Sequence, residues 1–184
     1  DFLIAYNVNL NTTSERRANS IAFDVREVGR VKTNEKGKPV LDDAGQPIRI
    51  PGACKSVKAI GWYIEEYGVA QISMNLTNIN DTPLHIAFDE CCKSATARGM
   101  RVTGSELVGL VPKSVLVDAG KYFLEKQRRS KGVSERELIH IAVRTLGLDE
   151  LSAFDPDKKV IEYLMENKAA RPLAHKTLIE FADA

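Results

Sequence analysis

Neutral amide side chains recur at alternate positions in two apolar segments, residues 2–11 and 69–78. Each amide carries two N–H donors and one carbonyl acceptor, so a row of amides suits a polar heterocycle or the backbone of another segment. Asn is a poor strand former, and solvated strands more often carry charged residues or Thr. The pattern therefore predicts a binding face, an interface with another sheet, or both. Its polar members are Asn7, Asn9, Asn11, Gln71, Ser73, Asn75 and Thr77.

Two titratable residues interrupt other patterns. Glu106 is an acid within the apolar segment 102–111, where it either faces solvent or holds an ammonium or amidine-like group. Gly104 and Gly109 allow a ligand or another backbone to approach closely, or mark bulges. His85 falls in the first turn of a helical pattern, where the helix N-terminus favours a neutral imidazole. It is either a general base or a surface or capping residue, because no orienting partner lies at readable spacing.

Other chemistries lack their motifs. The sequence has no Gly-rich phosphate loop, no nucleophile elbow and no Ser/His/Asp arrangement. Cys54, Cys91 and Cys92 cannot build a disulfide framework, which favours a reducing cytoplasm. We expect no metal site, because the dispersed histidines lack ligand spacing. His140 and His175 are interpreted as structural or solvated.

Alternating strand and helix patterns precede residue 112 and position the amide face. Their order is β-α-β-β-α-β, which predicts an α+β fold, the ferredoxin-like βαββαβ two-layer sandwich with helices over one sheet face. The expected strands are residues 2–11, 59–66, 69–78 and 100–111, and the expected helices are 14–29, with Thr13 or Ser14 as N-cap, and 82–98.

Two further regions complete the single domain expected over residues 1–184. Residues 31–58 are polar and turn-rich, a loop-like excursion with room for one short hairpin, and are either a mobile lid or a tolerated insertion. Residues 113–184 form a helical extension. Its expected helices are 113–128, 134–146 and 156–167, followed after Ala169 by a short helix or irregular chain. Ser134 and Glu137 have capping-box spacing at the start of the second of these helices, and Gly147 is expected just after its end.

Composition narrows the class of protein. The 184 residues are 43% hydrophobic and 28% charged, as in a soluble globular domain. The net charge of +1 with dispersed basic residues argues against nucleic acid and an anionic membrane, and RNA-binding sheets use stacking aromatics that this face lacks. No apolar run approaches the roughly 20 residues of a membrane span. Asp1 directly precedes a strand-like run, so we expect the chain to begin inside a longer protein.

Four stretches resemble a known family. Residues 2–10, 61–63, 70–76 and 102–112 are similar to the C-terminal subdomain of the formiminotransferase domain of glutamate formimidoyltransferases. The same domain opens the bifunctional formimidoyltransferase-cyclodeaminases. The resemblance runs from Phe2 to about Leu164, and residues 104–112 are its most specific part.

The resemblance implies an activity. Family members transfer a formimidoyl group between N-formimidoyl-L-glutamate and N5 of tetrahydrofolate, the co-substrate, in histidine degradation and one-carbon metabolism. Two subdomains face each other with their sheets across a folate cleft, which matches the predicted amide face. In that picture Lys58 or Arg101 offsets glutamate carboxylates. The residues implied to bind folate or substrate, or to support those that do, are Asn7, Asn9, Gln71, Asn75, Thr77, Lys58 and Glu106.

The resemblance also implies what this chain lacks. The catalytic base belongs to the family's N-terminal subdomain, so no catalytic residue is assigned here, His85 does not match its motif, and the fragment alone is expected to be inactive. Expected partners are that subdomain and a second copy in a homodimer. We expect no cyclodeaminase activity from these 184 residues, because they contain no segment assigned to that domain. The excursion is longer than expected for animal members, which leaves the surroundings of Lys58 open. The alternative function is a non-catalytic ferredoxin-like module for small-molecule binding or oligomerisation.

Overall fold

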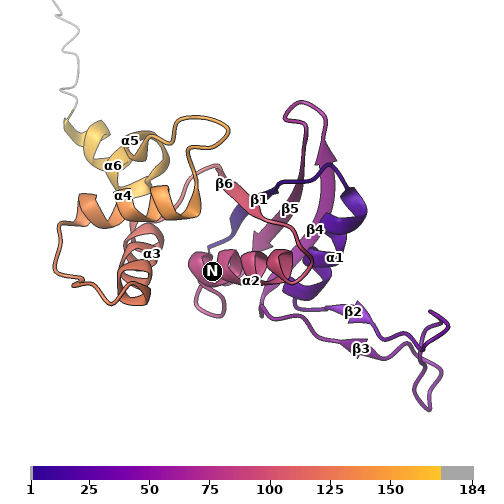
Figure 1. The fold of residues 1–184 in the computed structure, drawn as a ribbon. Coiled ribbons are helices and arrows are strands. Elements are labelled where there is room, and N and C mark those ends of the chain that lie inside the picture. The colour runs from indigo at the N-terminus through magenta and orange to yellow at the C-terminus, as the bar shows by residue number, and fades with distance from the viewer. Residues whose placement is uncertain (1, 171–184) are drawn as a thin grey trace, which may run out of the picture.

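The computed structural model describes residues 2–170. Its main sheet has the strand order β4-β5-β1-β6 with every neighbouring pair antiparallel, and α1 and α2 cover one face of it (Figure 1). This is the predicted ferredoxin-like arrangement. The strands are β1 (Ile4–Leu10), β4 (Val57–Ile64), β5 (Val69–Leu76) and β6 (Val102–Val108), and the helices are α1 (Glu15–Val25) and α2 (Leu84–Thr96).

The covered face of the sheet forms the core. Tyr6, Val8 and Ile72 are fully buried there, and Met74 is 1% exposed, so the apolar half of each alternating strand lies under the helices. The apolar stripe of α2, which includes Leu84 and Cys91, is buried as well. Each buried aliphatic side chain of this size stabilises the fold by about 1.5–3 kcal/mol.

The end of α1 differs from the prediction. Ser14 is the N-cap, as expected, and its Oγ accepts a hydrogen bond from Arg17 N. The helix stops at Val25 rather than near Gly29. The carbonyls of residues 24–25 accept hydrogen bonds of 2.8 and 2.9 Å from the N–H groups of residues 53–54. These tertiary partners take over carbonyls at the end of the helix, so no further turn forms.

The excursion contains the predicted hairpin. β2 (Arg30–Val31) and β3 (Arg49–Ile50) pair antiparallel, and two isolated bridges, Thr33–Pro39 and Leu41–Pro47, each close a smaller turn farther from the sheet. The hairpin projects from the sheet on the side away from α3–α6 (Figure 1). The predicted loop boundary at residue 58 is too late, because β4 begins at Val57 and already includes Lys58.

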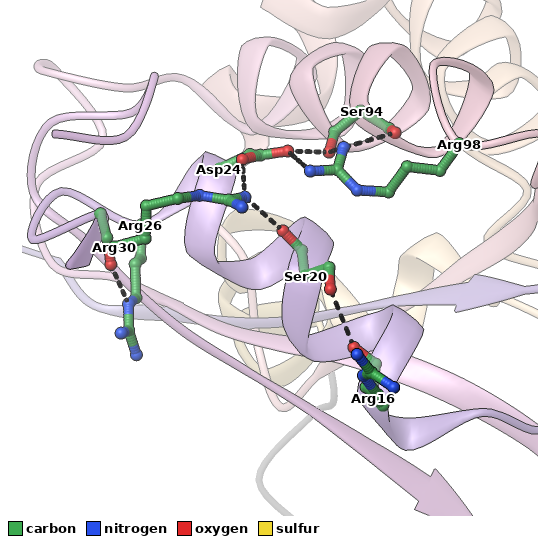
Figure 2. Close-up of polar contacts among 8 residues, drawn as sticks. Arg16, Ser20, Asp24, Arg26, Arg30, Ser94 and Arg98 are labelled. Atoms are coloured by element: carbon green, nitrogen blue, oxygen red, sulfur yellow. Dashed lines mark hydrogen bonds and ion pairs between the residues drawn. The ribbon is translucent and has the colours of Figure 1, made fainter. Parts of the chain in front are cut away.

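A polar cluster around Asp24 holds the base of this excursion against both helices (Figure 2). The Asp24 carboxylate of α1 accepts from Arg30 of β2 and forms an ion pair with Arg98. Ser94 of α2 donates its Oγ–H to the same carboxylate at 2.7 Å. The Asp24 side chain is 30% exposed, and exposed ion pairs contribute at most about 1 kcal/mol each. The cluster therefore acts mainly by fixing the relative placement of three segments.

The C-terminal extension packs beside β6. It comprises α3 (Lys113–Lys126), α4 (Glu135–Leu146), α5 (Pro156–Lys159) and α6 (Ile161–Ala170). As predicted, Ser134 caps α4 through Glu137 N at 3.2 Å, and Gly147 ends it with a φ of +64°. No helix within residues 2–170 combines the length and apolarity needed to cross a bilayer.

The prediction of one continuous helix over residues 156–167 is wrong, because α5 and α6 are separate helices. Val160 is extended and forms a parallel bridge with Val111, and both side chains are fully buried. Hydrogen bonds from Val111 N to Lys159 O (2.9 Å) and from Ile161 N to Val111 O (3.1 Å) replace helical ones at this point. The predictions for the tail beyond Ala170, including His175, lie outside the described residues.

Candidate functional site

The second face of the sheet, which α1 and α2 leave uncovered, carries the predicted site residues in three rows. Cross-strand partners lie on the same face of a sheet, so the pairing register defines each row. We call these twelve residues the open face. In the order β4, β5, β1, β6 the rows are Lys58, Asn75, Ala5, Val108; then Ile60, Ser73, Asn7, Glu106; and then Trp62, Gln71, Asn9, Gly104.

Two of the predicted amides are enclosed within the third row. Asn9 is fully buried and Gln71 is 1% exposed. Gln71 Nε2 donates to Asn9 Oδ1 at 2.7 Å, and Asn9 Nδ2 donates to the carboxylate of Glu150 at 2.6 Å. Buried amides that are hydrogen-bonded in this way hold a fixed orientation. They are placed to support the face rather than to contact a ligand directly.

The first and second rows are more accessible. Asn75 and Lys58 are exposed and stand opposite each other on β5 and β4. Asn7 is 9% exposed, and its Nδ2 donates to half-buried Glu106 at 3.4 Å. These side chains offer an amide, an ammonium and a carboxylate to a bound molecule. The open face can therefore bind donor and acceptor groups without strong net charge.

Three predicted residues, Thr77, Arg101 and Asn11, lie off the open face. Thr77 follows β5, and its Oγ1 donates to Ser56 O at 2.9 Å, which anchors the start of β4. Arg101 precedes β6, and its backbone N–H donates to Asn11 Oδ1 at 2.7 Å. Asn11 thus ties the end of β1 to the start of β6. As binding residues, Thr77 and Arg101 remain predictions without a place among the three rows.

Apolar side chains flank the amides. Ile60 and Trp62 on β4 are 55% and 45% exposed, and Val108 on β6 is 51% exposed. Large apolar side chains gathered on an uncovered face mark a contact surface more often than a solvated one. The amides thus occupy the middle of a surface with apolar edges.

Glu150 is the site residue that the sequence did not reveal. It lies between α4 and α5 and is separated from Asn9 by 141 positions. The one signal was Gly104, predicted to allow a close approach, since a Cβ there would clash with the Glu150 side chain and lie 2.7 Å from Gly147 O. The alternative prediction for this glycine, a β-bulge, is consistent with the register between β1 and β6, which shifts between Asn9 and Leu10.

His85 lies elsewhere and is not the surface or capping residue expected. It is 8% exposed, and its ring stacks on Tyr122 of α3 at 4.4 Å between centroids. Burial lowers its pKa, against the opposing charges of Asp118 and Asp89. Nδ1 is buried without a hydrogen-bond partner among the described residues. The imidazole is therefore neutral near pH 7, as predicted, but burial rather than the helix N-terminus lowers its pKa. The ring lies on the helix-covered side of the sheet, away from the amides of the open face.

Two of the cysteines and His140 are further candidates for a catalytic or metal site among the described residues. Burial raises the pKa of the Cys54 thiol to about 11 and that of Cys91 well above its ordinary value, so neither is an activated nucleophile. His140 lines a cavity of about 220 Å³ with Phe154 and Tyr163, away from the open face. Within residues 2–170, no cluster of three or more His, Cys, Asp or Glu side chains is arranged to hold a metal ion.

Comparison of the sequence with known proteins identifies the family to which the chain belongs. The chain belongs to the formiminotransferase domain family, whose model matches residues 5–166. It is 42% identical over 165 residues to the formimidoyltransferase-cyclodeaminase of Gallus gallus, covering 90% of this chain and 27% of that protein. Identity to the Dictyostelium discoideum formimidoyltransferase-cyclodeaminase is 39% over 184 residues, or 99% of this chain and 31% of the relative.

A third relative is similar as well. The glutamate formimidoyltransferase of Thermoplasma acidophilum is 34% identical over 139 residues, covering 75% of this chain and 39% of the relative. The chain therefore spans between 27% and 39% of the length of these three relatives. The resemblance inferred from the four sequence stretches is confirmed at the level of the family.

Proposed function

We infer that this chain is the folate-binding C-terminal subdomain of a glutamate formimidoyltransferase. The enzyme transfers a formimidoyl group between N-formimidoyl-L-glutamate and tetrahydrofolate, its co-substrate, in histidine degradation. The observation that carries this proposal is the open face, where neutral amides and exposed apolar side chains share one uncovered surface. Membership of the formiminotransferase domain family supports it.

The accessible rows fit the parts of a reduced folate. Asn7 and Asn75 match the mixed donors and acceptors of a pterin ring. Lys58, exposed beside Asn75, is placed to offset a carboxylate of a glutamate tail. Glu106 accepts from Asn7 and retains capacity for a ligand N–H group. Asn9 and Gln71 lie in the adjacent row, where they hydrogen-bond to each other.

A second sheet completes the cleft in this proposal. The exposed side chains of Ile60, Trp62 and Val108 would contact an N-terminal subdomain, which supplies the opposite wall, and the transferase works as a homodimer. We place the enzyme in the cytoplasm, in keeping with its three free cysteines.

The chemistry requires a group that this face does not carry. In the direction of histidine degradation, N5 of tetrahydrofolate attacks the amidine carbon of N-formimidoyl-L-glutamate to give a tetrahedral intermediate, which then expels the amino group of glutamate. A base takes up the N5 proton, and the departing nitrogen is protonated. The twelve residues of the open face include no histidine. His85 stacks on Tyr122 of α3 instead. As the resemblance to the family implies, we assign the base to the N-terminal subdomain. The face contributes binding and orientation.

Calorimetry tests this proposal. Tetrahydrofolate is titrated into the chain alone and into the chain combined with the N-terminal part of a relative's formiminotransferase domain. We expect micromolar binding and transfer from N-formimidoyl-L-glutamate in the combined sample, and no turnover by the chain alone. Absent or millimolar binding in both samples would contradict the proposal and favour a non-catalytic ferredoxin-like module. Turnover by the chain alone would refute the assignment of the base.

A further inference from the structure

The segment between α4 and α5 brings Glu150 over the open face and holds it there. Gly147 O accepts from Ser105 N of β6 at 3.0 Å, and Ser105 Oγ donates to Leu146 O at 2.7 Å. These bonds join the end of α4 to the outer edge of the sheet. The Glu150 side chain lies over Gly104, where a larger residue would leave no room. These backbone contacts and the close approach to Gly104 therefore fix the position of the Glu150 carboxylate over the sheet.

Two buried amides orient the carboxylate. A carboxylate only accepts hydrogen bonds, so Asn9 must turn its Nδ2 toward Glu150 and its Oδ1 toward Gln71. The distance of 2.6 Å from Asn9 Nδ2 to Glu150 Oε2 is short, as expected for a bond assisted by charge. In the neighbouring row the amide is oriented in the same way, since Asn7 Nδ2 donates to Glu106 at 3.4 Å. Both rows point their amide donors at a carboxylate on the β6 side.

The carboxylate retains capacity to bind. Its two oxygens offer about four lone-pair sites, and the Asn9 bond uses one of them. Glu150 is exposed and lines two hollows, of about 430 Å³ and 300 Å³. No ion pair joins Glu150 to another residue in the described part of the chain, and Arg144 near it pairs with Asp149 instead. Two fully or nearly fully buried amides thus fix a carboxylate that is open on its other side.

We propose that Glu150 is a substrate-binding residue that accepts hydrogen bonds from a planar N–C–N group carrying N–H donors. This inference rests on the proposed function. Both substrates contain such a group: the aminopyrimidinone end of tetrahydrofolate and the formimidoyl group of N-formimidoyl-L-glutamate. A carboxylate can accept two parallel N–H bonds from either one. Asn9 and Gln71 are positioning residues that act through Glu150.

The test is Glu150→Gln in the chain combined with the N-terminal part of a relative's formiminotransferase domain. The substituted amide can still accept from Asn9 through its oxygen, so the row persists, but its NH₂ then faces the ligand donors. Glu35→Gln is the matched control, because Glu35 is exposed in the excursion. Tetrahydrofolate and N-formimidoyl-L-glutamate are titrated separately by calorimetry, and thermal unfolding verifies that both variants fold.

We expect Glu150→Gln to weaken the binding of one ligand about tenfold or more, while Glu35→Gln changes neither. The ligand that loses affinity identifies the N–C–N group. If both ligands bind the Glu150→Gln variant as tightly as the unmodified protein, the role of Glu150 is refuted and the proposed function stands. If neither ligand binds the unmodified protein, the proposed function fails, and the role of Glu150 fails with it.

Discussion

The two faces of one sheet are built from neighbouring residues and follow different rules. On the covered face Tyr6, Val8 and Ile72 are fully buried beneath α1 and α2. On the open face Asn7 and Asn75 occupy the alternate positions of the same strands. Packing explains the first set, because each member fills the core. It does not explain the second, since charged or Thr residues would serve a solvated face as well. The difference separates residues that stabilise the fold from residues that are available for binding.

The largest expected effect lies on the covered face. Ile72→Ala should lower the free energy of unfolding by about 2–5 kcal/mol, because it removes buried methyl groups and leaves a cavity. Urea unfolding followed by circular dichroism measures it. Asn75→Ala, on the same strand but exposed, is the matched control and should stay within about 0.5 kcal/mol. Similar losses at both positions would remove the distinction between the faces.

A polar chain within the covered face gives the next effect. Tyr6 donates its hydroxyl to Ser105 Oγ at 2.8 Å, and Ser105 in turn donates to Leu146 O. Ser105→Ala should cost about 1–3 kcal/mol, because it leaves buried polar groups without partners. Adding Tyr6→Phe should recover part of that loss by removing one of them. If the second substitution only deepened the loss, the Tyr6 hydroxyl would have another role.

A substitution on the open face should weaken tetrahydrofolate binding without changing the free energy of unfolding. Asn75→Ala should raise the KM for tetrahydrofolate about 3–10-fold in the chain combined with the N-terminal subdomain, the range expected for one lost hydrogen bond. Initial rates at varied tetrahydrofolate measure it. Asn80→Ala, exposed between β5 and α2, is the control. An unchanged KM in the Asn75→Ala variant would remove Asn75 from the site.

The smallest effect concerns pH. Burial lowers the pKa of His85 in the folded protein, so the unfolded chain takes up a proton first as pH falls below about 6.5. The free energy of unfolding should therefore decrease from pH 7.5 toward acid, and this contribution levels off once pH is below the lowered pKa. His85→Phe should show a weaker decrease. Equal pH dependence of urea unfolding in both proteins would show that His85 does not titrate as its burial predicts.

Local sequence patterns predicted most helices and strands. The element boundaries that those patterns predicted wrongly are determined by contacts between segments that are distant in sequence. Alternation placed β1 and β5, and capping residues such as Ser134 and Gly147 marked the ends of α4. The early end of α1 and the break at Val160 both follow from hydrogen bonds to remote segments. No local rule contains those partners.

The same limit applies to the site. The three rows of the open face followed from strand alternation, and most of the predicted residues lie in them. Burial divides them further: Asn9 and Gln71 are enclosed because Glu150, 141 positions from Asn9, lies above. His85 is buried because Tyr122 of α3 covers it. Neither contact leaves a signal in spacing.

The most direct test of the open face as the folate wall compares both faces in one experiment. The isotopically labelled chain, combined with the unlabelled N-terminal subdomain, is titrated with tetrahydrofolate and followed by nuclear magnetic resonance. We predict that side-chain amide signals of Asn7 and Asn75 shift, while methyl signals of Val8 and Ile72 on the covered face do not. Shifts confined to the covered face and its helices, or no shifts at saturating tetrahydrofolate, would contradict the account.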